Sequence, residues 1–276
     1  MRLTRFGSLL GVVLLALVRT PASARNDSST VSTLEQAERL LETTESGRQV
    51  LEAAREGRIT WVLGQVSRTE VTATRTVHDE VETVHYDTRV IISGSKSPVF
   101  QALDLAHELV HALRPKENPF HPALKPGDYV VRGIEGEGGE AEAIAYECRV
   151  GREWIDRSKS RVIPEEDLAL VRARCGMVWK AMADGEKWKR SFYYLGQHYR
   201  DFLDRLTRLE PGSAEMKRWK ERLDPRTPIF SSAMAQKPYP LALLEEYLEL
   251  TRKICSRSPA SESPFSKRCG TLERVK

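Results

Sequence analysis

The sequence has few cysteines and few aromatic residues, and it lacks the common nucleotide-binding motifs. Its 276 residues include 4 cysteines and 7% aromatic side chains. No two cysteines form a Cys-x-x-Cys pair, which argues against a zinc ribbon and a thioredoxin-like redox site. Walker loops, dinucleotide-binding glycine fingerprints and Gly-x-Ser-x-Gly elbows do not occur. These absences exclude P-loop enzymes, Rossmann dehydrogenases and hydrolases with a nucleophile elbow.

Long apolar runs are also missing, with one exception at the N-terminus. Residues 1–24 combine a positively charged start, the 13-residue apolar run 6–18 and the small residues Ala22-Ser23-Ala24. This order is typical of a cleavable secretory signal peptide. The run is too short for a membrane-spanning helix, which needs about 20 apolar residues. We expect residues 1–24 to be removed, leaving an exported periplasmic or secreted protein without stable membrane insertion.

A strong excess of one charge is missing once this segment is set aside. The whole chain has 43 basic and 39 acidic residues, a formal net charge of +4. Three of the basic residues, Arg2, Arg5 and Arg19, lie within residues 1–24, and no acidic residue does. The remainder has a net charge of +1, so no nucleic-acid partner is expected.

Export changes the interpretation of the four cysteines. An even number of cysteines in an oxidising compartment predicts two disulfides, and four cysteines allow three pairings. We favour Cys148–Cys175 and Cys255–Cys269, because each pairs neighbours in the sequence and closes a modest loop.

The remaining pattern predicts an α+β protein with a small antiparallel sheet and a mostly helical C-terminal region. Hydrophobic residues make up 40% of the chain, which is enough for a globular core. The predicted order is a signal peptide (1–24), N-terminal helices (25–57), a core (58–160), a helical region (161–256) and a flexible tail (257–276). Within it we expect strands near 59–62, 71–74 and 84–92, a helix from Ser97, a Pro- and Gly-rich loop over 115–139, and helices near 140–157, 164–183, 186–208, 213–223 and 238–256.

One motif predicts the chemistry. His107, Glu108 and His111 form His-Glu-x-x-His, and residues four apart share one face of a helix. Both imidazoles can therefore bind one zinc ion at about 2.1 Å. Glu108 is rotated by about 100° from His107, so it is placed to take a proton from a zinc-activated water. The apolar residues around the motif predict an amphipathic helix: Phe100, Leu103, Ala106, Leu109, Val110 and Leu113.

A catalytic zinc site of this kind needs a third protein ligand. The segment 140–147 is acidic and helical in pattern, and Glu140 and Glu147 share a face while Glu142 does not. One carboxylate of that face can bind zinc and the other can bind a ligand histidine. A solvated acidic helix start is the alternative. Asp104, one turn before His107, is either a hydrogen-bond partner for an imidazole or an ordinary exposed acid.

Residues 105–113, Leu-Ala-His-Glu-Leu-Val-His-Ala-Leu, resemble the zinc helix of zincin metallopeptidases whose third ligand is a glutamate. They are most similar to the helix of clostridial neurotoxin light chains and type III effector metallopeptidases. In that group a small residue stands three positions after the ligand glutamate. A second glutamate often stands seven positions after the ligand glutamate. Glu140, Ala143 and Glu147 match this spacing, whereas the thermolysin-like Glu-Ala-Ile pattern matches Glu142. We favour Glu140.

The resemblance implies a zincin-like fold, with the small antiparallel sheet packed on the His-Glu-x-x-His helix. It implies one zinc ion held by His107, His111 and Glu140, and a metallopeptidase in which Glu108 is the general base for hydrolysis of a peptide or protein substrate. By analogy, the strand near 84–92 would present its edge to an extended peptide, and Arg190-Ser191-Phe192-Tyr193 resembles the Arg-x-x-Tyr pair that steadies the oxyanion.

One feature limits the resemblance. Injected effectors do not normally carry an export signal, so a periplasmic or secreted enzyme is the expectation here. The alternative function is a non-proteolytic zincin-like domain that binds a metal ion or a partner. A helical binding protein with a fortuitous motif is the third hypothesis.

Overall fold

The computed structural model describes residues 28–78, 81–114, 124–157, 163–183, 185, 188–189, 231–232, 237–256 and 269. The expected signal peptide, almost all of the predicted helix 186–208, the predicted helix 213–223 and most of the tail lie outside these residues. The described part is mixed α and β and mostly helical, with one three-stranded sheet. The predicted α+β class is confirmed at this level.

Two helices precede the sheet, as predicted for residues 25–57. They are α1 (Ser28–Glu42) and α2 (Glu45–Glu56). Thr44 caps α2, because its hydroxyl accepts a hydrogen bond from the backbone N–H of Gly47. The fully buried Leu41 and Leu51 place one face of each helix in the main hydrophobic core.

The sheet is mixed, so the predicted antiparallel sheet is wrong in one pairing. Its strands are β1 (Thr60–Gly64), β2 (Arg68–His78) and β3 (Val81–Ser93), in the spatial order β1-β3-β2. β2 pairs with β3 in antiparallel fashion, whereas β1 pairs with β3 in parallel. β3 is most buried where it pairs with both neighbours, in the run Val90, Ile91 and Ile92, since a strand covered on both faces is continuously apolar.

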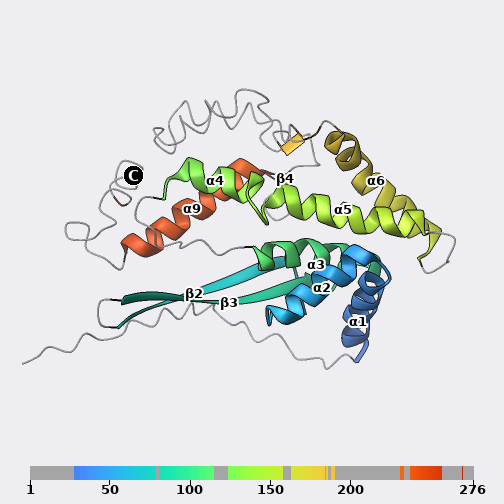
Figure 1. Cartoon of the computed structure of the whole chain (residues 1–276), viewed down its shortest axis with the longest axis horizontal. Coiled ribbons are helices and arrows are strands. Elements are labelled where there is room, and N and C mark those ends of the chain that lie inside the picture. The colour runs from blue at the N-terminus through green and yellow to red at the C-terminus, as the bar shows by residue number, and fades with distance from the viewer. Residues whose placement is uncertain are drawn as a thin grey trace, which may run out of the picture.

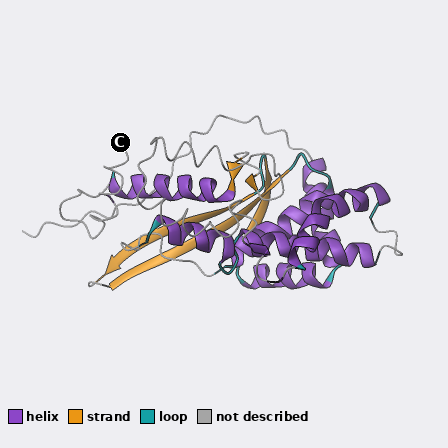
Figure 2. Cartoon of the chain, turned by 90° about the horizontal axis from the view of Figure 1, so that it is seen from above, coloured by secondary structure: helices purple, strands orange, loops and turns teal. Residues whose placement is uncertain are grey.

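This order places the strand near 84–92, which was expected to present its edge to a peptide, between two neighbours over residues 89–91. Residues 89–93 of β3 have β1 on one side, and β2 occupies the other side of β3 as far as residue 91. The outer edge on the antiparallel side belongs to β2. Most of the described helices lie at one end of the strands, and the β2–β3 hairpin reaches beyond them (Figure 2).

The helix that carries the motif is α3 (Pro98–Leu113), which begins next to the predicted start at Ser97. It lies between the sheet and α5 (Figure 1) and also packs against α1 and α2. The predicted amphipathic helix is therefore a central helix buried on almost every side. Its buried residues are Val99, Gln101, Ala102, Leu103, Asp104, Leu105, Ala106, Glu108, Leu109, Val110 and Ala112.

A helix, α4 (Pro126–Glu135), lies inside the segment predicted to be a loop. Pro126 stands in the first turn, where a missing backbone N–H costs nothing. Val130 and Ile134 are four residues apart and both buried, and α4 lies beside α9. Here tertiary burial outweighs the turn signals of proline and glycine.

The later helices match three predicted ranges: α5 (Glu140–Asp156), α6 (Glu165–Met182) and α9 (Tyr239–Cys255). The short strands β4 (Ser231–Ser232) and β5 (Lys237–Pro238) pair just before α9. Side chains of α5 contribute to both large hydrophobic clusters, so this helix joins the sheet side of the molecule to α4 and α9. Among the described residues, no helix is long and apolar enough to cross a membrane.

Both favoured disulfides are present. Cys148–Cys175 joins α5 to α6, and Cys255–Cys269 ties the end of α9 to the C-terminal region. Disulfides persist mainly outside the reducing cytosol. The two bonds therefore favour a non-cytoplasmic location.

Candidate metal centre

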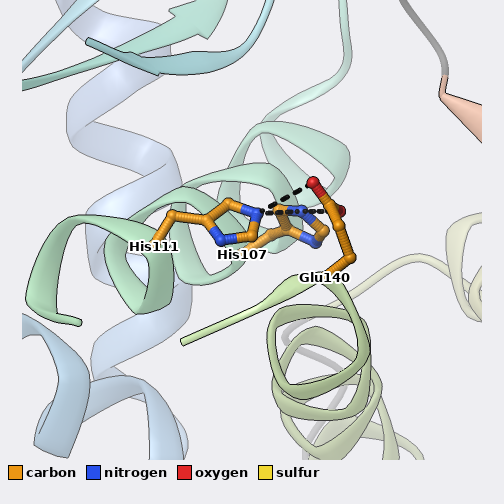
Figure 3. A group of neighbouring side chains, drawn as sticks. All are labelled: His107, His111 and Glu140. Carbon is orange, nitrogen blue, oxygen red and sulfur yellow. Dashed lines mark hydrogen bonds and ion pairs between the residues drawn. The ribbon is translucent and has the colours of Figure 1, made fainter. Parts of the chain in front are cut away.

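The two motif histidines face the same point from successive turns of α3. The Nε2 atoms of His107 and His111 lie 3.1 Å apart (Figure 3). Both side chains are largely buried, with 14% and 13% of their surface exposed. The shared helix face predicted from the four-residue spacing brings the two imidazoles together.

The outer nitrogen of each ring is held by a hydrogen bond. Nδ1 of His111 donates to the carbonyl oxygen of Gly138 at 2.7 Å. Nδ1 of His107 donates to the carboxylate of Glu147 at 3.2 Å. A ring that donates through Nδ1 in its neutral form keeps an acceptor lone pair on Nε2. In that neutral form two acceptor atoms meet at close range, and a cation between them would stabilise the arrangement.

Glu140 adds a third acceptor from the first residue of α5. Its carboxylate oxygens lie 3.5 Å from Nε2 of His107 and 3.5 Å from Nε2 of His111. Oxygen Oε2 is buried and has no hydrogen-bond partner among the described residues. Ligand atoms at about 2.0–2.1 Å from a tetrahedral zinc ion lie about 3.3 Å from one another. The observed spacing fits such an ion.

The alternative third ligand, Glu142, binds the backbone instead of facing the histidines. Its carboxylate accepts a hydrogen bond from the backbone N–H of Gly138 at 2.6 Å. Among the described residues, the three that could hold one metal ion together here are His107, His111 and Glu140. The structure thus groups Glu140 with the histidines, whereas Glu142 of α5 binds the loop residue Gly138.

The electrostatics of the cluster follow from this arrangement. Burial lowers the pKa of His107, but the adjacent carboxylates of Glu140 and Glu147 outweigh this effect and raise the pKa well above 6.5. Burial raises the pKa of Glu140, but His111 and His107 outweigh it and lower this pKa strongly. The pocket therefore favours a positive charge between the histidines and Glu140.

Glu108 lies beside the cluster and is buried, with 9% of its surface exposed. Burial raises the pKa of its carboxyl, while the charges of His107 and His111 oppose that rise. The hydroxyl of Thr69 on β2 lies 2.8 Å from a carboxylate oxygen of Glu108 and 2.8 Å from its backbone carbonyl. The sheet edge thus reaches the predicted general base.

Asp104 does not bind an imidazole, and it is not an exposed acid either. It is buried and accepts hydrogen bonds from Lys96 at 2.5 Å and from Ser67. Its other carboxylate oxygen lies 3.4 Å from Arg174 of α6. The carboxylate that holds His107 is Glu147, one of the two uses predicted for the acidic face of α5.

Sequence reasoning missed Tyr239, the first residue of α9. Its hydroxyl lies close enough to Glu140 for that carboxylate to influence its pKa. Burial, together with the nearby charges of Glu140 and Glu147, raises its pKa well above 10.0. No local spacing links Tyr239 to the motif, so only the fold could reveal it. The predicted pair Arg190 and Tyr193 lies outside the described residues.

No family model, curated protein or solved structure matches this chain. The resemblance to zincin peptidases therefore stays a prediction from the sequence.

Proposed function

We propose that the protein is an exported zinc-dependent metallopeptidase. The observation that carries this proposal is the convergence of three buried acceptors, on His107, His111 and Glu140, beside the carboxylate of Glu108. Two imidazoles and one carboxylate are the ligand set of a catalytic zinc site that keeps a fourth position open. When bound, zinc would acidify a water molecule and polarise a carbonyl group of the substrate.

Glu108 is the group that handles protons in this proposal. It would accept a proton from the attacking water and pass it to the leaving amine. Burial raises the pKa of Glu108, which strengthens it as a base. Thr69 restricts its carboxylate by a 2.8 Å hydrogen bond. The carboxylate is thus both held in place and shielded from solvent.

Tyr239 is the donor that we assign to the oxyanion of the substrate. Its hydroxyl already reaches Glu140, so it lies at the edge of the same cluster. The raised pKa keeps the phenol protonated at neutral pH, as a hydrogen-bond donor must be. The donor suggested by the sequence was Tyr193, which lies outside the described residues.

The edge of β2 supports an extended peptide as the substrate. Thr69 belongs to β2 and contacts Glu108, so this strand runs directly past the proposed base. On the side away from β3, its backbone can pair with an added strand. A peptide bound there would pass Glu108 with its backbone extended. The strand expected for this role was the one near 84–92, and β2 takes its place.

Export is part of the proposal. The two disulfides favour a non-cytoplasmic location, and residues 1–24 have the pattern of a cleavable signal. Protein recovered from the periplasm or the medium should begin at Arg25. Intact-mass analysis would reveal this start, and a retained N-terminus in exported protein would contradict cleavage.

The decisive experiment compares the wild type with Glu108→Gln on a broad peptide library. Glu108→Gln should keep zinc and lose cleavage by a factor of about 100 or more, because only the proton-accepting group is removed. Glu142→Gln is the matched control and should cleave like the wild type, because its amide oxygen can still accept the hydrogen bond from Gly138. A wild type that holds one zinc ion and cleaves no peptide would instead support the non-proteolytic binding domain. Equal cleavage by Glu108→Gln would refute the role of Glu108.

A further inference from the structure

A chain of buried charges lies behind the proposed zinc ligand His107. Arg174 of α6 donates to both carboxylate oxygens of Glu147, at 3.0 Å from Nε and 2.9 Å from Nη2. Nη2 also lies 3.4 Å from Asp104. Arg174 therefore bridges α5 and α3, the two helices that carry the metal-site side chains.

The positive and negative charges of this buried group of side chains balance. The side chains of Glu147 and Asp104 are only 4% and 5% exposed. Arg174 lies against both, and Lys96 approaches Asp104 at 2.5 Å. Two carboxylates are thus matched by two cations. A buried carboxylate without such a partner would be strongly destabilising.

One oxygen of Glu147 serves two donors. Oε2 accepts from Nη2 of Arg174 at 2.9 Å and from Nδ1 of His107 at 3.2 Å. The bidentate contact with Arg174 fixes the orientation of the Glu147 carboxylate, because the guanidinium binds both of its oxygens at once. The oxygen that orients the His107 ring is therefore held in place from α6.

The disulfide reinforces this contact. Cys148 directly follows Glu147, and Cys175 directly follows Arg174. Their bond joins α5 to α6 at the level of the ion pair. The two side chains are consequently held face to face by a covalent link between their neighbours.

We propose that Arg174 is a positioning residue for His107, which it orients through Glu147. The proposal rests on the zinc site proposed above and assigns a task to α6, a helix that contributes no zinc ligand. With Arg174 in place, Nδ1 of His107 stays bonded to Glu147 and Nε2 stays directed at His111 and Glu140. Without it, Glu147 is free to rotate and the imidazole loses its fixed orientation.

The test measures zinc affinity of the whole mature chain by competition with a chromophoric chelator. Arg174→Met should weaken zinc binding by about 10- to 100-fold, the usual cost of losing an outer partner of a metal ligand. Arg174→Lys should be weakened less, because it keeps the charge but not the bidentate contact. Arg172→Met is the matched control on α6, since Arg172 pairs with Glu165. Its affinity should stay within about twofold of wild type.

A double-mutant cycle separates positioning from general loss of structure. In a Glu147→Gln background, Arg174→Met should change zinc affinity by no more than about twofold. The carboxylate through which Arg174 orients His107 is already missing from that variant. A purely structural role would weaken zinc binding by the same factor in both backgrounds. Thermal melting of each chelator-treated variant checks folding, and Arg174→Lys takes the place of Arg174→Met in the cycle if the latter does not fold.

The possible failures are distinguishable. If the wild type binds no zinc, the proposed function fails and this inference fails with it. If the wild type binds zinc and Arg174→Met binds it equally well, only the inference is overturned. Equal factors in the two backgrounds of the cycle would also overturn it.

Discussion

At the residue scale, Glu140 and Glu142 are two positions apart yet have different surroundings. Glu140 faces both histidines, and Glu142 binds the backbone of Gly138. Glu140→Ala should weaken zinc binding by more than the roughly 100-fold that outer partners contribute. Glu142→Ala should leave most of the affinity intact. Zinc titration of both variants checks this, and the reverse ranking would make Glu142 the ligand.

Zinc affinity should depend on pH through His107. A proton and a zinc ion compete for its Nε2, so affinity falls when His107 is protonated. Because Glu140 and Glu147 raise the pKa of His107 well above 6.5, the fall should begin above pH 6.5 as the pH is lowered. Glu147→Gln removes one of the raising causes and should move the fall to lower pH. Competition titrations across pH 5–9 would show this, and a fall confined to values below 6.5 would contradict it.

Gly138 is required in the loop that supports His111. Its φ of +62° is a conformation that residues with a Cβ rarely adopt, and an added Cβ would overlap the side chain of Arg114. Gly138→Ala should therefore lower both stability and zinc affinity, because its carbonyl oxygen holds His111. Gly185→Ala has a similar φ of +67° but open space around its Cβ. It should cost about 1 kcal/mol of stability without changing zinc affinity, as melting and titration would show.

At the element scale, the bond between α5 and α6 should matter more to the site than the second disulfide. Cys148 and Cys175 are 27 residues apart, so replacing both by serine should cost about 3–4 kcal/mol of stability in the chain-entropy model. Zinc affinity should fall as well, because α6 carries Arg174. Replacing Cys255 and Cys269, 14 residues apart, should cost about 3 kcal/mol and leave zinc affinity unchanged. Equal zinc affinity in both double variants would contradict the coupling of α6 to the site.

Helices with a regular apolar period could be predicted from the sequence, and pairings between distant segments could not. The ranges of α3, α5, α6 and α9 follow from local periodicity and end signals. α4 was missed because Pro126 and the nearby glycines resemble a loop, while its burial depends on α9. The parallel pairing of β1 with β3 was missed because local sequence does not identify the neighbour of a strand.

The same distinction applies to the site. His107, Glu108 and His111 are predictable because a single helix sets their spacing. Glu140 follows from its face of α5 and from the zincin resemblance. Thr69, Arg174 and Tyr239 come from β2, α6 and α9, and only the packing of these elements brings them to the motif.

At the scale of the whole molecule, the metal should stabilise the fold. The proposed ligands come from α3 and α5, which pack against each other in the core, so zinc would bind the folded chain in preference to the unfolded one. Free zinc at 100 times its dissociation constant should add about 2.7 kcal/mol. A chelator should lower the melting temperature by several degrees, and added zinc should restore it. Glu140→Ala should melt at the same temperature with and without chelator.

The most direct test of the central claim is anomalous diffraction at the zinc absorption edge from crystals of the protein grown with zinc. The account predicts one strong peak per chain, about 2.0–2.1 Å from Nε2 of His107, Nε2 of His111 and a carboxylate oxygen of Glu140. Glu108 should lie near the peak without touching it. A peak elsewhere, or none at these three side chains, would contradict the proposed metal centre.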